Sequence, residues 1–198
     1  MRIGVLAIQG DFAAHARAIG RIGADVIEVR RVDDFAGLDG LIIPGGETTT
    51  MLKFIEQEKL TQPIVDHARA RGPIFGTCAG AILLARAVHN PAQSSLGLID
   101  IAVERNAYGR QVDSFITEVE TTLEGGPMEA VFIRAPRIRE VGPGVEVIAH
   151  LKDEPVLVRE GNMLAATFHP ELTEDLRTHS LFAEMIRSFV VRPSGGSW

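Results

Sequence analysis

Cysteine is nearly absent from this chain, which has a single one, Cys78, among 198 residues. One cysteine cannot form an internal disulfide, so we expect a protein of a reducing compartment, the cytoplasm. The six histidines show no metal-ligand spacing, and neither C-x-x-C nor H-E-x-x-H occurs. We therefore expect no metal site and no bound cofactor.

Long apolar runs and an excess of basic residues are also missing. No stretch is long enough to span a bilayer, and the apolar run at residues 3–8 is too short for the core of a signal peptide. The formal net charge is −6, whereas binding to phosphates of nucleic acids needs a basic surface. Neither a membrane nor a nucleic acid is therefore expected as a partner. The composition fits one globular domain, which we place at residues 1–191, followed by a loose tail at 192–198.

Strand-like and helix-like segments alternate in the first half of the chain. In order, these segments are residues 2–8, 11–22, 25–30, 40–43, 48–58, 62–71 and 74–75. Such alternation predicts right-handed βαβ crossovers and a mostly parallel sheet with helices on both faces.

The second half is richer in short β-segments that are separated by turn residues. These segments are residues 99–105, 114–120, 131–134, 145–151, 156–159 and 163–168. They predict an antiparallel extension of the same sheet, and a helix at about 178–190 closes the domain. The expected fold class is α/β, a three-layer sandwich with a mostly parallel central sheet, helices on both faces and an antiparallel β extension.

The single cysteine lies in Gly-Thr-Cys-Ala-Gly, residues 76–80, between an apolar strand and a helix-forming run at 81–87. This is the nucleophile-elbow pattern, with sulfur in place of the serine hydroxyl. The glycines let strand and helix pass closely, and the helix N-terminus favours the thiolate. The ordinary alternative is a buried structural cysteine, but the two flanking glycines favour a nucleophile.

A thiol nucleophile needs a base, and His169-Pro170-Glu171 follows an apolar segment. A residue before proline is pushed towards extended backbone, where residues i and i+2 point the same way. We therefore expect His169 to be the base and Glu171 to fix its tautomer from behind. The histidines of helix-like segments are expected at the surface; they are His15, His67 and His179.

A third feature is Pro-Gly-Gly-Glu, residues 44–47, between a strand and a helix. Glycines here allow a backbone N–H to approach a ligand and furnish one oxyanion donor, with the N–H of Ala79 as the other. Taken alone, Pro-Gly-Gly is more often a plain turn. It is not a phosphate loop, because no Gly-Lys-Ser/Thr follows.

These three motifs, in this order, resemble those of the class I, triad-type glutamine amidotransferases. Within that class, further stretches resemble the glutaminase subunit of pyridoxal 5′-phosphate synthase. They are residues 5–10, 104–115, 132–136 and 168–173. The resemblance runs from about Ile3 to Phe189, which is nearly the whole chain.

The resemblance implies that Cys78 is the nucleophile, His169 the general base and acid, and Glu171 its orienting partner. The residues that it implies for the glutamine site are Gly46, Glu47, Thr48, Arg105, Ile133 and Arg134. It further implies Gly46 and Ala79 as oxyanion donors, and Gln9 near the oxyanion region and the partner interface. The family more often has serine where this chain has Thr48, and both residues carry a hydroxyl. An arginine suits the α-carboxylate of glutamine, and the alternatives for Arg105 and Arg134 are a surface ion pair or a contact to the partner.

The implied reaction is hydrolysis of L-glutamine to glutamate and ammonia through a cysteine thioester. The implied partner is the synthase subunit, a (β/α)8 barrel, in a hetero-oligomer that makes pyridoxal 5′-phosphate (vitamin B6). Three alternatives stay open at this stage. The first is a triad glutaminase that serves an imidazole- or purine-forming synthase. The second is a cysteine hydrolase or peptidase on the same fold, and the third is a non-catalytic module that uses Cys78 as a redox sensor.

Overall fold

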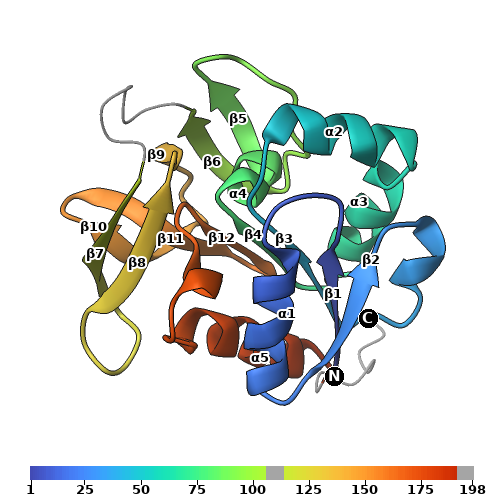
Figure 1. The fold of residues 1–198 in the computed structure, drawn as a ribbon. Coiled ribbons are helices and arrows are strands. Elements are labelled where there is room, and N and C mark those ends of the chain that lie inside the picture. Colours follow the sequence, from blue (N-terminus) through green and yellow to red (C-terminus); the bar gives the residue numbers. More distant parts are fainter. Residues whose placement is uncertain (106–113, 191–198) are drawn as a thin grey trace, which may run out of the picture.

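The computed structural model describes residues 1–105 and 114–190 of the chain (Figure 1). The predicted tail at 192–198 and residues 106–113 of one family-like stretch lie outside the described residues. The central element is a nine-stranded sheet with the order β2-β1-β3-β4-β12-β11-β10-β7-β8. No helix in the described ranges is both long and apolar enough to cross a membrane.

Five neighbouring strands of this sheet run parallel. They are β1 (Arg2–Leu6), β2 (Asp25–Val29), β3 (Gly40–Ile43), β4 (Ile74–Thr77) and β12 (Met163–Ala166). The helices are α1 (Phe12–Arg21), α2 (Thr48–Gln57), α3 (Thr61–Arg69), α4 (Ala79–Leu84) and α5 (Arg177–Val190), with 3-10 turns η1 (Val32–Phe35) and η2 (Pro170–Leu172). The predicted mostly parallel sheet is confirmed, and its strand ends differ from the expected ones by only a few residues.

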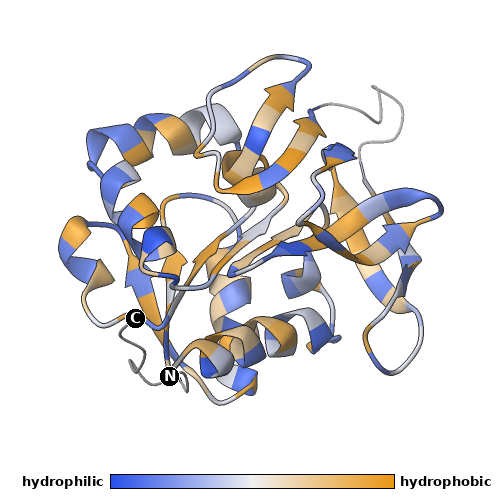
Figure 2. Ribbon diagram, turned by 180° about the vertical axis from the view of Figure 1, so that it is seen from behind, coloured by the Kyte–Doolittle hydropathy of each residue, from blue (hydrophilic) through white to orange (hydrophobic). Residues whose placement is uncertain are grey.

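Two apolar cores cover the two faces of the sheet, because neighbouring residues of a strand point to opposite faces. Leu41 and Ile43 of β3 lie in the core shared with α2, α3 and α4, whereas Ile42 lies in the core shared with α1 and α5. Figure 2 shows hydrophobic residues concentrated in the central strands and hydrophilic ones on the outer faces of the helices. The result is the three-layer arrangement that the sequence predicts.

The antiparallel extension is also confirmed. It consists of β11 (Glu154–Glu160), β10 (Glu146–Leu151), β7 (Ser114–Thr121) and β8 (Met128–Ile133). β11 pairs antiparallel with β12, so the extension begins directly beside the parallel half. It continues through β10 and β7 to β8, also by antiparallel pairs.

A second, three-stranded sheet corrects the sequence-based prediction in two respects. It contains β5 (Ala85–His89), β6 (Ile99–Glu104) and β9 (Arg137–Val141) in the order β5-β6-β9. The helix expected at 81–87 ends at Leu84, and residues 99–105 do not join the main sheet. Arg86 explains part of the difference, because its guanidinium pairs with Asp100 on β6 and Glu140 on β9 and ties the three strands together.

Candidate active site

The elbow holds Cys78 between β4 and α4 in a conformation that few residues adopt. Its φ of 48° is positive, and its ψ is −102°. A Cβ on Gly80 would lie 1.9 Å from the carbonyl oxygen of Ile43, and a Cβ on Gly76 would lie 2.6 Å from the Gly80 backbone. Only glycine fits at either position, because backbone cannot move aside as a flexible side chain does. The predicted close passage of strand and helix is therefore present.

Direct pairing of β12 with β4 brings the histidine segment to the elbow. Ala166 stands opposite Thr77 in the register, and the Cys78 N–H donates to the Ala166 carbonyl at 2.8 Å. His169 follows three residues later, and its Nδ1 lies 2.7 Å from Glu171 Oε1. Glu171 reaches the imidazole from the 3-10 turn η2, rather than from the extended backbone that we expected.

The charges of this pair follow from burial and from its neighbours. Burial lowers the pKa of His169, but the Cys78 and Glu171 side chains outweigh this effect and raise the pKa to about 10. Burial raises the pKa of Glu171, but His15 and His169 outweigh it, so the pKa of this carboxyl is lowered overall. At neutral pH the pair is therefore an imidazolium held by a carboxylate.

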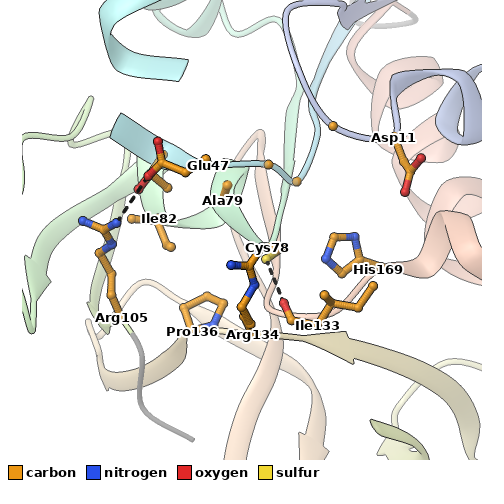
Figure 3. A pocket seen from close by; sticks show the side chains of 14 residues that line it. Asp11, Glu47, Cys78, Ala79, Ile82, Arg105, Ile133, Arg134, Pro136 and His169 are labelled. Atoms are coloured by element: carbon orange, nitrogen blue, oxygen red, sulfur yellow. Dashed lines mark hydrogen bonds and ion pairs between the residues drawn. The ribbon is translucent and has the colours of Figure 1, made fainter. Parts of the chain in front are cut away.

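Cys78 and His169 line a cavity of about 290 Å³ (Figure 3). This volume is near the lower end for small-molecule sites, which suits a ligand of amino-acid size. The structure places seven of the residues implied by the resemblance in the same lining, namely Gly46, Glu47, Thr48, Ala79, Arg105, Ile133 and Arg134. The Cys78 thiol faces the Ile133 carbonyl, with Sγ 3.8 Å from the oxygen.

Two of the implied residues, Gln9 and Glu171, do not line the cavity, and Gln9 lies beside it. Gln9 Oε1 accepts from the Glu47 N–H at 3.3 Å, so it supports the loop that follows β3. Five further lining residues were given no role from the sequence, although most of them lie within stretches quoted above. They are Gly10, Asp11, Gly45, Ile82 and Pro136. Gly45 passes so close to the base that a Cβ there would lie 2.4 Å from Cε1 of the His169 ring.

Glu47 keeps a negative charge at the rim of the cavity. Its carboxylate caps α2 by accepting from the amides and the hydroxyls of Thr49 and Thr50. These hydrogen bonds, that of the Thr49 hydroxyl first, lower the pKa of Glu47 to about 2. A carboxylate at this place offers a partner for an ammonium group.

The two arginines that the resemblance implies, Arg105 and Arg134, differ in their hydrogen bonds and ion pairs. Arg105 donates to Gln93 Oε1, and its Nη2 lies 3.8 Å from Glu47 Oε1. Thr48 also donates to Gln93 Oε1, at 2.9 Å. Arg134 is exposed and has no hydrogen bond or ion pair with any described residue. Its guanidinium is therefore the freer of the two to bind an anionic group. Gln93 was missed because it stands in a loop without a motif.

Two histidines that we expected at the surface are fully buried, so that prediction is wrong. His15 on α1 and His179 on α5 each have 0% exposure, whereas His67 is half-buried. Both face the sheet near Glu171, where His15 finds a polar partner for each ring nitrogen and His179 finds one for Nε2 alone among the described residues. The sequence carried one signal for this, since His15 shares a helix face with Ile19, four residues on.

This sheet, with its cysteine at a strand-to-helix elbow beside a histidine and a glutamate, defines the chain as a class I glutamine amidotransferase by fold. A solved structure titled "Crystal structure of glutamine amidotransferase" matches with a TM-score of 0.87 and 48% identity, over 93% of this chain and 98% of that one. A putative GMP synthase protein from Thermoplasma acidophilum shares the fold at a TM-score of 0.71 and 19% identity, over 96% of each chain.

The chain belongs to the SNO glutamine amidotransferase family, whose sequence model matches residues 5–188. A relative from Koribacter versatilis (strain Ellin345), called pyridoxal 5′-phosphate synthase subunit PdxT, is 55% identical over 95% of this chain and 97% of its own length. A relative of the same name from Thermotoga sp. (strain RQ2) is 50% identical over 94% of this chain and 100% of its own. The family resemblance seen in the motifs is thereby confirmed.

Proposed function

We propose that this chain is the glutaminase subunit of a pyridoxal 5′-phosphate synthase. It hydrolyses L-glutamine at Cys78 and hands the ammonia to its synthase partner. The observation that carries the catalytic part is the His169–Glu171 pair, 2.7 Å apart, whose imidazole lines the same small cavity as the elbow cysteine. The relatives named PdxT support the pathway, because this chain aligns with nearly their whole length and about half of the aligned residues are identical.

Glutamine binds with its side-chain amide towards Cys78 and its amino-acid end towards the rim. Arg134, which no described residue engages, receives the α-carboxylate. The Glu47 carboxylate receives the α-ammonium, and the Thr48 hydroxyl and Arg105 complete the wall.

In the first half of the reaction, the Cys78 thiolate attacks the amide carbon. The N–H groups of Gly46 and Ala79 hold the oxyanion. The imidazolium of His169 then gives its proton to the leaving nitrogen, the C–N bond breaks and ammonia departs. A γ-glutamyl thioester remains on the sulfur.

In the second half, the now neutral His169 takes a proton from water as the water oxygen attacks the thioester carbon. The C–S bond breaks, glutamate leaves, and the thiolate and imidazolium are restored together. Glu171 stays ionised throughout, fixes the ring and stabilises its cationic form.

The chemistry of ammonia, the product that is passed on, explains why a partner is needed. Ammonia in water at neutral pH is mostly protonated and then cannot act as a nucleophile, so it is passed on through a dry path. The partner is the synthase subunit, for which the family resemblance implies a (β/α)8 barrel. The complex is a hetero-oligomer, and the isolated chain is a weak glutaminase that the partner stimulates.

Release of ammonia and glutamate is measured for the wild type and for Cys78→Ala, each with and without the synthase subunit. We expect weak activity of the wild type alone, clear stimulation by the partner, and none with Cys78→Ala. Undiminished hydrolysis by Cys78→Ala contradicts the mechanism, and equal rates with and without the partner contradict the coupling.

Two further measurements separate the other functions. A glutamine-analogue electrophile should label Cys78 covalently, whereas a redox-sensing module would not be labelled in this way. The synthase subunit should copurify with the chain, and copurification of an imidazole- or purine-forming synthase in its place refutes the pathway. Cleavage of peptides without release of ammonia from glutamine assigns the chain to the peptidases.

A further inference from the structure

Two buried imidazoles lie behind the Cys78 pocket, on the far side of Glu171 from His169. Helices α1 and α5 cover the same face of the sheet (Figure 1). His15 on α1 and His179 on α5 are in contact between them. Their rings are 5.3 Å apart, and His15 Nδ1 lies 3.1 Å from His179 Nε2. Neither ring has a place in the reaction as described above.

The other nitrogen of His15 reaches two parts of the active site at once. Nε2 lies 3.1 Å from Thr77 Oγ1 and 3.3 Å from Glu171 Oε2. Thr77 directly precedes Cys78, and Glu171 holds His169 with its other carboxylate oxygen. His15 therefore touches the segment of the nucleophile and the acid that orients the base.

The Glu171 carboxylate determines which nitrogen of His15 carries the proton. Oε2 is buried and makes no hydrogen bond with any described residue, and His15 Nε2 lies 3.3 Å from it. A proton on Nε2 points a donor towards this buried oxygen, whereas a lone pair there would face the carboxylate. Nδ1 then bears a lone pair, which accepts from the Nε2–H of His179. His179 Nδ1 is then a buried acceptor with no partner in the part of the chain that the structure describes, whereas the opposite tautomers would leave a buried donor there.

Both rings are neutral in this arrangement. Burial lowers the pKa of His15 more than Glu171 and Asp11 raise it, and His169 lowers it further. Burial, with His15 next, lowers the pKa of His179 to about 3. The His169 imidazolium already balances the buried charge of Glu171, and a second buried cation would have no partner of its own.

We propose that His15 is a positioning residue of this active site. The Nε2–H of its neutral ring donates to Thr77 Oγ1 and lies against Glu171 Oε2, 3.3 Å away, and so fixes the orienting carboxylate and the nucleophile's strand relative to each other. His179 fixes the tautomer of His15. The proposal rests on the proposed glutaminase function for its kinetic readout only.

The tautomer is tested directly by long-range ¹H–¹⁵N spectra of the protein labelled at histidine nitrogens. We expect His15 to be protonated at Nε2 alone at pH 7, with Nδ1 showing the shift of an accepting nitrogen. Protonation at Nδ1 alone overturns the proposal, because Nε2 then has no proton to place against Glu171.

The kinetic test compares His15→Phe with His15→Gln in the complex with the synthase subunit. Phenylalanine keeps the ring that packs edge-on to Phe75 but removes both nitrogens, whereas glutamine places an amide N–H near the position of Nε2. We expect His15→Phe to lower kcat about 10–100-fold, which is the loss seen when a residue that orients a metal-binding side chain is removed. The KM should stay within twofold of the wild-type value. His15→Gln should recover most of this loss.

Two controls separate positioning from stability and from the proposed function. Ile19→Val, one turn along the same buried face of α1, perturbs the packing without touching a polar group and should keep kcat. Alkylation of Cys78 by iodoacetamide at pH 7 needs no glutamine, and it should slow in His15→Phe but not in Ile19→Val. The proposal is overturned if His15→Phe keeps the kcat and the alkylation rate of the wild type. It is also overturned if His15→Phe, His15→Gln and Ile19→Val lose kcat equally. Absence of glutaminase activity in the wild type overturns the proposed function instead, and the alkylation rates still decide the role of His15.

Discussion

Replacing Gly80 by alanine tests how the elbow positions its nucleophile. The new Cβ would lie 1.9 Å from the Ile43 carbonyl oxygen and 2.8 Å from the carbonyl carbon, whereas ordinary contacts begin at 3.4 Å. Because the obstacle is the backbone of a central strand, α4 has to retreat from β3. The retreat needed to reach ordinary contact, 3.4 Å less 1.9 Å, is about 1.5 Å, and Cys78 moves with the helix that it precedes.

Such a displacement has a calculable cost for catalysis and a smaller one for stability. A misplacement of about 1 Å at a reacting centre lowers rates about 100-fold, so we predict that Gly80→Ala lowers kcat by at least this factor. Overpacking of a well-packed interior typically costs about 1–3 kcal/mol of unfolding free energy. The protein should therefore still fold while losing most of its activity.

The assay is steady-state glutaminase kinetics of the complex, together with unfolding in urea. Gly20→Ala on α1 is the matched control, because no atom lies within 4 Å of its added Cβ. A glycine-to-alanine change in a helix should add about 0.5–1 kcal/mol to the free energy of unfolding and leave kcat unchanged. A Gly80→Ala protein that keeps kcat within threefold of the wild type would refute the reasoning, since the sulfur would then not depend on this contact.

Three further predictions concern charge. Glu171→Gln should lower kcat about 10²–10⁴-fold with little change in KM, because an amide cannot stabilise the imidazolium; a kcat near that of the wild type contradicts this. Arg134→Ala should raise KM for glutamine at least about tenfold, since a charge-assisted hydrogen bond contributes about 1.5–3 kcal/mol. Arg105→Ala should raise it less, because two side chains already engage that guanidinium. His179 should make the protein less stable as the pH falls from 6.5 towards 3, by about 1.4 kcal/mol per pH unit, because only its unfolded form takes up the proton. Denaturation at a series of pH values should show this slope, and His179→Phe should flatten it; an unchanged slope in that variant assigns the acid sensitivity to other groups.

The parallel half of the fold was predictable because four of its five strands are buried on both faces and the strands alternate with amphipathic helices. The part that failed is the stretch after the elbow. Leu83, Leu84 and Ala85 are all fully buried, so the apolar pattern runs through the change from α4 to β5 without a break. The strands of the second sheet pair through their backbones across long sequence separations, with the ion pairs of Arg86 on their exposed side, and no local pattern reveals such pairing.

The candidate site was predictable where the backbone demands a particular residue. Gly76 and Gly80 indicate a close passage of backbone, which the structure contains. Pro170 was a poorer guide, because it predicted extended backbone where the structure has the 3-10 turn η2. The buried histidines and Gln93 were not predictable in the same way. Their roles depend on distances between segments far apart in the chain, and a helical histidine alone is equally compatible with a solvent-facing side.

The place of β12 in the sheet affects when the protein can first act during its synthesis. β12 lies between β4 and β11, and seven of the described strands separate it from β4 in the sequence. A ribosome therefore makes the thiol early and its base near the end. On the proposed mechanism, the growing polypeptide therefore carries the thiol of Cys78 without the imidazole that would activate it until β12 takes its place in the sheet, and hydrolysis of glutamine has to wait for that step.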